Sequence, residues 1–81
     1  MNDDLLTAAD LLSRHRWGRR GKGMCAVDAI KAVTGGVSTE RFRLAYNALG
    51  RVVKCPRNTN LHDWNDRQPN KRAVLRAMRR A

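Results

Sequence analysis

The sequence has few acidic residues for its length. Seven of its 81 residues are Asp or Glu and 17 are Lys or Arg, which gives a formal net charge of +10 at pH 7. This imbalance argues against a cationic partner and favours a polyanion. The cations form two blocks on either side of a nearly balanced middle: Arg14, Arg16, Arg19, Arg20 and Lys22, then Arg67, Lys71, Arg72, Arg76, Arg79 and Arg80.

Cysteines and long apolar runs are equally scarce. Cys25 and Cys55 lie 30 positions apart, which excludes the dense disulfide framework of small secreted domains and favours reduced thiols. Together with His15 and His62 they lack the close spacing of zinc ligands, so we expect no metal and no other cofactor. No apolar run approaches the roughly 20 residues that span a bilayer, and the acidic opening lacks the layout of a secretory signal. We therefore expect a cytoplasmic protein with no membrane contact.

Aromatic residues are also few: Trp17, Phe42, Tyr46 and Trp64. In one small domain covering residues 1–81, every large apolar side chain is needed for the core. We expect all four aromatic side chains there, which leaves no obvious platform for base stacking and does not distinguish DNA from RNA as a partner.

Helical spacing of apolar residues runs through almost the whole chain and predicts a mainly α fold of about four helices. The first helix is expected to end near Arg14, the second to run from Met24 to about Thr34, the third to begin after Ser38 or Thr39 and end near Gly50, and the last to follow Pro69-Asn70. Gly35-Gly36 supply the turn between the second helix and the third.

The stretch from Arg51 to Asn65 is ambiguous. Residues 52–55 favour a short strand, residues 56–60 favour a turn, and residues 61–64 could form the second strand of a hairpin. A small β-hairpin and a loop fit this stretch equally well. The sequence Trp64-Asn65-Asp66 is typical of a turn that Trp64 attaches to the core, with Asn65 or Asp66 satisfying backbone amides at the start of the last helix.

The second and third predicted helices resemble a helix-turn-helix, a motif that usually dimerises on a two-fold DNA site. Apolar residues recur where that motif packs: Ala32, Val37, Phe42 and Ala45. Lys31 and Gly35 stand where the motif prefers apolar side chains, so the alternative is a plain helical hairpin with a solvated basic face.

Three sets of residues are candidates for function. Arg43, Asn47 and Arg51 share one outer stripe of the third helix, with Arg41 at its edge, in a pattern suited to contacting base edges. Cations of the glycine-rich loop 18–23 and of the last helix are suited to phosphate contacts: Arg19, Arg20, Lys22, Arg72, Arg76, Arg79 and Arg80. A flexible surface loop and a solvated helix face are the plainer alternatives for these two segments.

Cys25 lies near a predicted helix start among cations, which would lower its thiol pKa, and His62, Asn65 and Asp66 could complete a nucleophilic set. A small buried cysteine that packs the helix start explains the same residue more simply. We therefore predict no catalytic residues.

Several short motifs follow one another in order: Leu-x-x-Ala-Ala-Asp-Leu-Leu from Leu5, Trp17-Gly18, Gly-x-Cys25-x-x-x-Ala and Trp64-Asn65-Asp66. In this order they resemble a small uncharacterised family, a domain of unknown function, shared by actinobacteria and their phages. Asp28 replaces a Gly that is frequent there, and Asn70-Lys71-Arg72 replaces Gly-Arg-Thr, so the resemblance implies no shared ligand at those positions. It implies a helical fold and a phage or prophage setting, and its recurring residues look like scaffold: Trp17, Cys25, Trp64, Asn65 and Asp66.

The sequence thus leads to one hypothesis and one rival. The hypothesis is a small basic accessory protein that binds nucleic acid, duplex DNA first, in a bacterial or phage-infected cytoplasm, as a monomer or a homodimer. The rival is a protein-interaction module that docks on an acidic host protein, because charge alone does not separate the two.

Overall fold

Each helix of the fold begins at a residue whose side chain caps its first turn. The computed structural model describes residues 2–19, 22–54 and 60–81, and over these ranges it contains five α-helices and no β-strand: α1 (Asp3–Ser13), α2 (Ala26–Thr34), α3 (Glu40–Val53), α4 (Leu61–Arg67) and α5 (Lys71–Arg80). The capping side chains are those of Asn2, Cys25, Thr39, Asn60 and Asn70, and each accepts a hydrogen bond from the backbone N–H three residues later. These bonds satisfy amides that a helix start leaves without an intrahelical partner.

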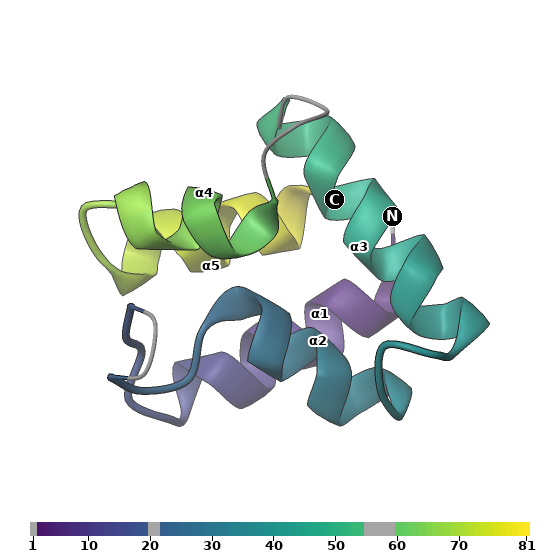
Figure 1. The fold of residues 1–81 in the computed structure, drawn as a ribbon. Helices are drawn as coiled ribbons and strands as arrows, with labels where there is room; N and C mark the ends of the chain where they lie inside the picture. The colour runs from purple at the N-terminus through teal and green to yellow at the C-terminus, as the bar shows by residue number, and fades with distance from the viewer. Residues whose placement is uncertain (1, 20–21, 55–59) are drawn as a thin grey trace.

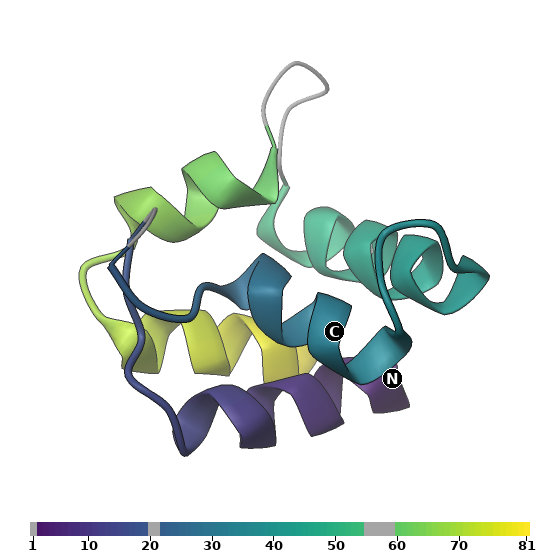
Figure 2. The same cartoon turned by 60° about the horizontal axis from the view of Figure 1, so that its bottom comes forward.

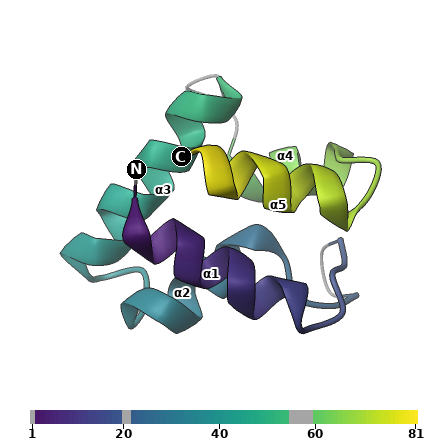
Figure 3. The same cartoon turned by 180° about the vertical axis from the view of Figure 1, so that it is seen from behind.

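The helices form two layers and a crosspiece. Helices α1 and α5 lie side by side on one face (Figure 3), while α2 and α4 lie on the opposite face (Figure 1). Helix α3 runs across one end of both layers and contacts α1, α2 and α5 (Figures 1 and 2). The backbone N–H of Asn2 donates to the carbonyl of Ala81 at 2.9 Å, so the start of α1 lies beside the end of α5.

All five helices contribute to one apolar core. Its largest fully buried apolar side chains are Leu5, Leu12, Val27, Ile30, Leu49, Leu61, Val74 and Met78. Burying a side chain of this size stabilises the fold by roughly 1.5–3 kcal/mol. Since Val74 and Met78 fix the inner side of α5, the charged residues of that helix lie on its outer side.

The predicted β-hairpin and the count of four helices are both wrong. Val52 and Val53 form the last turn of α3, which ends where Lys54 adopts a left-handed conformation with φ 54°. Residues 61–64 belong to α4, the fifth helix, and so do Asn65 and Asp66, which were expected in a turn. The β-branched pair suggested a strand, but the packing of Val53 against the core keeps it helical. The middle of the predicted hairpin, residues 55–59, lies outside the described residues.

The pair of helices that resembles a helix-turn-helix is present as α2 and α3, but its packing differs from the expected pattern. Phe42 and Ala45 are buried against the core, as the pattern requires. Val37 is 61% exposed and Ala32 is also exposed, so these two apolar residues do not pack across the turn. Gly35 and Gly36 have φ angles of 94° and 119°, values that favour glycine and turn the chain away from α2.

Candidate nucleic-acid interface

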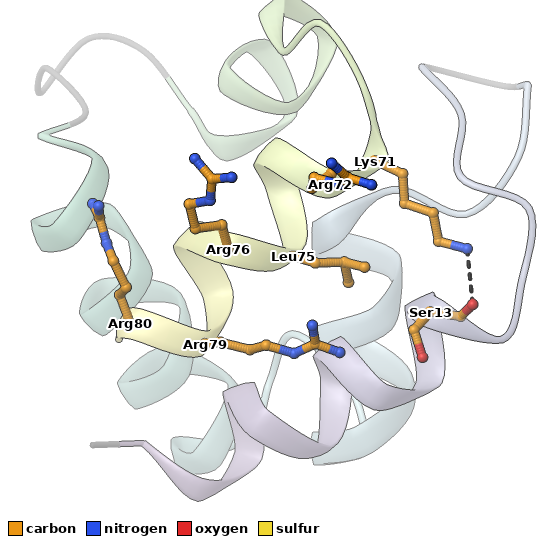
Figure 4. Close-up of a pocket in the computed structure, with 7 residues that line it drawn as sticks. All are labelled: Ser13, Lys71, Arg72, Leu75, Arg76, Arg79 and Arg80. Atoms are coloured by element: carbon orange, nitrogen blue, oxygen red, sulfur yellow. Dashed lines mark hydrogen bonds between the residues drawn. The ribbon is translucent and has the colours of Figure 1, made fainter.

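Helix α5 carries the highest density of positive charge in the described chain. Five of its ten residues are cations and none is acidic: Lys71, Arg72, Arg76, Arg79 and Arg80. Lys71 and Arg79 extend along the side that faces α1, whereas Arg76 and Arg80 point away from α1 (Figure 4). The buried Val74 and Met78 on the inner side leave this charge facing solvent.

Lys71 is committed to the fold. Its Nζ donates to the carbonyl oxygens of Ser13 and His15 at 2.9 and 2.7 Å. Helix α1 has no basic residue in its own last turn, so the ammonium group supplies a positive charge and hydrogen-bond donors at the end of α1 where carbonyls lack intrahelical partners. Lys71 therefore joins α5 to α1 and is less available to a ligand than its neighbours.

The other four cations of α5 have little compensation. Arg79 lies 3.9 Å from a carboxylate oxygen of Asp10, an exposed and long ion pair. The side chains of Arg72, Arg76 and Arg80 form no ion pair or hydrogen bond within the described part of the chain. Arg72 also lies in the first turn, where the helix dipole disfavours positive charge, and the spacing of Arg72, Arg76 and Arg80 adds like-charge repulsion. These positions weaken the helix slightly, which indicates that something other than stability accounts for the charge.

An open cavity of about 630 Å³ lies along this face. Ser13 lines it from α1 and Leu75 forms its apolar floor, with the α5 cations around the rim (Figure 4). A rim of guanidinium groups suits phosphate or carboxylate oxygens, which they bind through paired N–H donors. The apolar floor adds a surface for an uncharged part of the same ligand.

Helix α3, where we expected base contacts, presents its arginines differently. Arg41 points back to α1, and its Nε and Nη2 donate to the two carboxylate oxygens of Asp4 at 3.2 and 2.7 Å. The guanidinium group of Arg41 holds the pKa of Asp4 below its ordinary value of 3.8, and the same bond raises the pKa of Arg41. Arg41 thus fixes the start of α3 against α1 and lies off the predicted reading stripe.

Arg43 is paired within its own helix. Its guanidinium group forms an ion pair with the Glu40 carboxylate, three residues earlier, and both side chains are more than half exposed. The bond to Arg43 lowers the pKa of Glu40, and the bond to Glu40 raises the pKa of Arg43. An exposed pair of this kind contributes little to stability and exchanges readily for another anion.

Asn47 and Arg51 complete the predicted stripe, and both are exposed. Neither side chain bonds to another residue in the described ranges. Leu44, which is 50% exposed, lies between Glu40 and Asn47 on the same outer side of α3. Two of the four predicted base-contact residues are therefore available, and the other two are held by carboxylates.

The basic loop between α1 and α2 is tied to α4. Arg19 donates from Nε to the carbonyl oxygen of Asp66 and from Nη2 to that of Gln68, both at 2.8 Å. Lys22 is exposed, and Arg20, the third predicted phosphate contact of this loop, lies outside the described residues. Arg19 therefore holds the basic loop against α4, whether or not a ligand is bound.

Asn65 is the centre of this connection and is fully buried. Its Oδ1 accepts from Trp17 Nε1 at 2.8 Å and from the Ala26 N–H at 3.1 Å, and its Nδ2 donates to the Gly18 carbonyl at 3.2 Å. The same Nδ2 reaches the Asp66 carboxylate at 3.3 Å. Asn65 therefore binds the basic loop and α2 together, while the start of α5, its expected place, is capped by Asn70. Trp64, the other aromatic residue of this segment, is partly buried against the core.

Cys25 is buried at the start of α2, where its Sγ accepts from the Asp28 N–H. The structure also brings His62 Nδ1 to 3.9 Å from this sulfur. Burial raises the pKa of the Cys25 thiol, contrary to the lowering that its position in the sequence suggests, because the loss of solvent outweighs the nearby N–H donors. A raised pKa disfavours the thiolate form that a nucleophilic cysteine needs. Across the described ranges, no group of three His, Cys, Asp or Glu side chains is placed to hold a metal ion.

Two contributions to this surface were missed from the sequence. The apolar floor at Leu75 is absent from the predicted site because Leu75 was not assigned to the outer side of the helix. The pairing of Arg41 with Asp4 joins residues 37 positions apart, and only the packing of α3 on α1 reveals it. The acidic first turn of α1 was visible in the sequence, but its partner was not.

Fold and surface together define a small basic all-α domain with a cationic helix whose charge has little compensation. The chain belongs to the family described as Family of unknown function (DUF6197), which matches residues 1–81. No curated protein and no solved structure matches it. None of the described helices has the length and apolar character needed to cross a membrane.

Proposed function

We propose that this protein binds nucleic acid, double-stranded DNA in the first instance, through phosphate contacts made by α5. The observation that carries this proposal is the run of five cations on ten residues without a carboxylate, including cations at the helix start where they weaken the helix. A polyanion is the partner that relieves such repulsion, and release of its counterions favours association.

In this proposal the two basic helices have different roles. Arg72, Arg76, Arg79 and Arg80 hold phosphates on α5, and Lys22 extends the contact from the loop. Asn47 and Arg51 contact base edges from α3, and Arg43 joins them by exchanging Glu40 for an acceptor on the nucleic acid. Arg41 supports the start of α3. The setting is the cytoplasm of a bacterium or of a phage-infected cell, and no catalytic step is involved.

The test is an anisotropy titration of labelled duplex DNA, single-stranded DNA and duplex RNA at about 50 and 200 mM salt. Five phosphate contacts, four on α5 and one from Lys22, predict a slope of log K against log salt of roughly −4.5 on duplex DNA, since each contact contributes about −0.9. Absence of binding to all three probes at the lower salt would refute the proposal.

A second function has one observation in its favour. The α5 cavity has an apolar floor at Leu75 inside its cationic rim, and a helix that carries both acidic and apolar side chains would complement it. Capture of a host protein that persists after nuclease treatment, and that Leu75→Glu abolishes, would favour this docking function. Loss of every captured protein on nuclease treatment would favour nucleic acid.

A further inference from the structure

A second cavity, of about 380 Å³, opens beside the basic loop. It is lined by Arg16, Trp17, Gly18, Arg19, Lys22 and Asp66. Trp17 packs against the core, as expected, but it is only partly buried. The guanidinium carbon of Arg19 lies 5.2 Å from the centre of the Trp17 ring, so a flat cation covers the aromatic ring beside the cavity.

Both flat groups are held in place before any ligand arrives. Trp17 Nε1 donates to the buried Asn65, and two nitrogens of Arg19 donate to the backbone carbonyls of Asp66 and Gln68. The loop closes tightly at Gly18, where a Cβ would lie 2.3 Å from the Lys22 carbonyl oxygen. A guanidinium group and a ring that are already held in place lose little conformational freedom when a flat ligand is added.

Two further cations lie at the same cavity. Arg16 and Lys22 are exposed, and neither side chain forms an ion pair with another residue of the described ranges. A guanidinium group over an aromatic ring, next to exposed cations, matches a nucleobase with its phosphate, because bases stack on aromatic rings and guanidinium planes while phosphates bind cations. A simple inorganic anion would make no use of the planes.

The cavity adjoins the α5 surface. Ser13 lines the α5 cavity, Arg16 lines this one three residues later, and Lys71 Nζ bonds the carbonyls of Ser13 and His15 between them. A strand whose phosphates lie along α5 therefore reaches the loop at the end of α1.

We propose that this cavity takes an unpaired nucleobase of the bound nucleic acid, stacked on Arg19 and Trp17 with its phosphate on Arg16 and Lys22. This inference rests on the proposed function and adds a preference for single-stranded segments beside a duplex. Paired bases inside a blunt duplex do not enter the cavity, so the site reads the presence of a free base and leaves duplex phosphates to α5.

The test compares three probes of the same duplex: blunt, with a short single-stranded overhang, and with the same overhang lacking its bases. We expect the protein to bind the overhang with bases at least about fivefold more tightly than the abasic one, since stacking contributes about 1 kcal/mol or more per base. Arg19→Lys keeps the charge and removes the plane, so this preference should disappear. Equal affinity for the two overhangs, with the blunt duplex still bound, would overturn this inference alone, whereas no binding of any probe would overturn the proposed function as well.

Trp17 fluorescence provides a second measurement that does not depend on the Arg19 variant. In a Trp64→Phe protein Trp17 is the remaining tryptophan of the two in the chain, and the overhang with bases should quench its emission while the abasic overhang should not. Thermal unfolding of both variants checks that the loop remains folded. Quenching by thymidine monophosphate at the same concentration and to the same extent would assign the cavity to free nucleotides and overturn the inference.

Discussion

Helices α3 and α5 both carry several arginines, but carboxylates pair with most of them on α3 and with few on α5. α3 begins with Glu40, which pairs with Arg43, and its Arg41 is held by Asp4 of α1. α5 begins with Lys71 and Arg72 and contains no carboxylate. The two helices therefore differ in how much of their positive charge is paired with carboxylates, and not in the number of arginines alone.

The difference shows that the number of cations does not locate a binding surface. What distinguishes the two helices is whether the protein neutralises its own charge. On α3 the carboxylates lower the free energy of the unbound protein, and an anionic ligand must displace them. The cost of that displacement is small, because exposed ion pairs contribute little free energy. On α5 the repulsion among Arg72, Arg76 and Arg80 is relieved only by an external anion.

The largest effect is expected from removing charge on α5. Replacing Arg72, Arg76 and Arg80 together with Gln should weaken duplex binding roughly 10- to 100-fold at about 50 mM salt, and should reduce the salt slope by about 0.9 for each phosphate that the variant no longer neutralises. Stability should hold or rise slightly, because Gln forms helix nearly as well as Arg and the repulsion is gone. Anisotropy titrations and thermal unfolding measure the two quantities.

The matched control removes the same charge from α3. Arg41→Gln, Arg43→Gln and Arg51→Gln together leave the net charge equal to that of the α5 variant. The reduction in non-specific affinity should be smaller, because two of these three arginines are already paired with carboxylates. Equal reductions for the two triple variants would show that α3 and α5 contribute alike to binding. The claim that ion pairing makes α3 the weaker binding surface would then be wrong.

A smaller, different effect is expected from Asn47→Ala. If Asn47 contacts a base edge, its removal should reduce the preference for a duplex that the parent protein selects from random sequences. The expected reduction is roughly fivefold or more, with affinity for random DNA unchanged. Competition between a selected duplex and a scrambled one measures this ratio. Asn70→Ala is unsuitable as a control, because Asn70 caps α5 and its loss would affect that helix. An unchanged ratio would remove α3 from base recognition.

The fold was largely predictable from local patterns. Apolar spacing and polar caps indicated four of the helices, because these signals lie within a few neighbouring residues. α4 was missed because its seven residues are too short to show periodicity and follow a segment rich in turn residues. The isolated sequence could not show that Trp64 to Asp66 is helical, since Asn65 owes its position to partners on the distant loop and on α2.

The candidate surface was predictable only in part. The cationic side of α5 follows from the sequence, because a helix with buried Val74 and Met78 must expose its arginines. The neutralisation of Arg41 and the commitment of Lys71 to α1 were not predictable, because each depends on contacts between residues far apart in the chain. Sequence charge therefore identifies helices that are basic and overestimates the cationic surface of those whose arginines are paired.

A gain of roughly twofold in affinity is expected from Glu40→Gln. The substitution releases Arg43 and removes a carboxylate that repels phosphate from the face of α3. Asp3→Asn is the matched control, since it removes one charge from the first turn of α1, where Asp3 forms no ion pair with the described residues. An equal gain for both variants would attribute the effect to net charge and not to the release of Arg43.

The smallest effect concerns stability and its dependence on pH. Because Arg41 lowers the folded pKa of Asp4 below 3.8, the pair stabilises the fold above the unfolded pKa, and this contribution disappears as pH falls through the folded value. Asp4→Asn should slightly lower the midpoint of thermal unfolding at pH 7, and the difference from the parent protein should vanish at a pH well below 3.8. Arg41→Gln should produce a similar decrease at pH 7, and the double variant should be little less stable than either single one, because both remove the same bond. A difference for Asp4→Asn that persists in acid would mean that its carboxylate acts otherwise than through Arg41, and the pair of Glu40 with Arg43 would then be the one that sets α3 apart from α5.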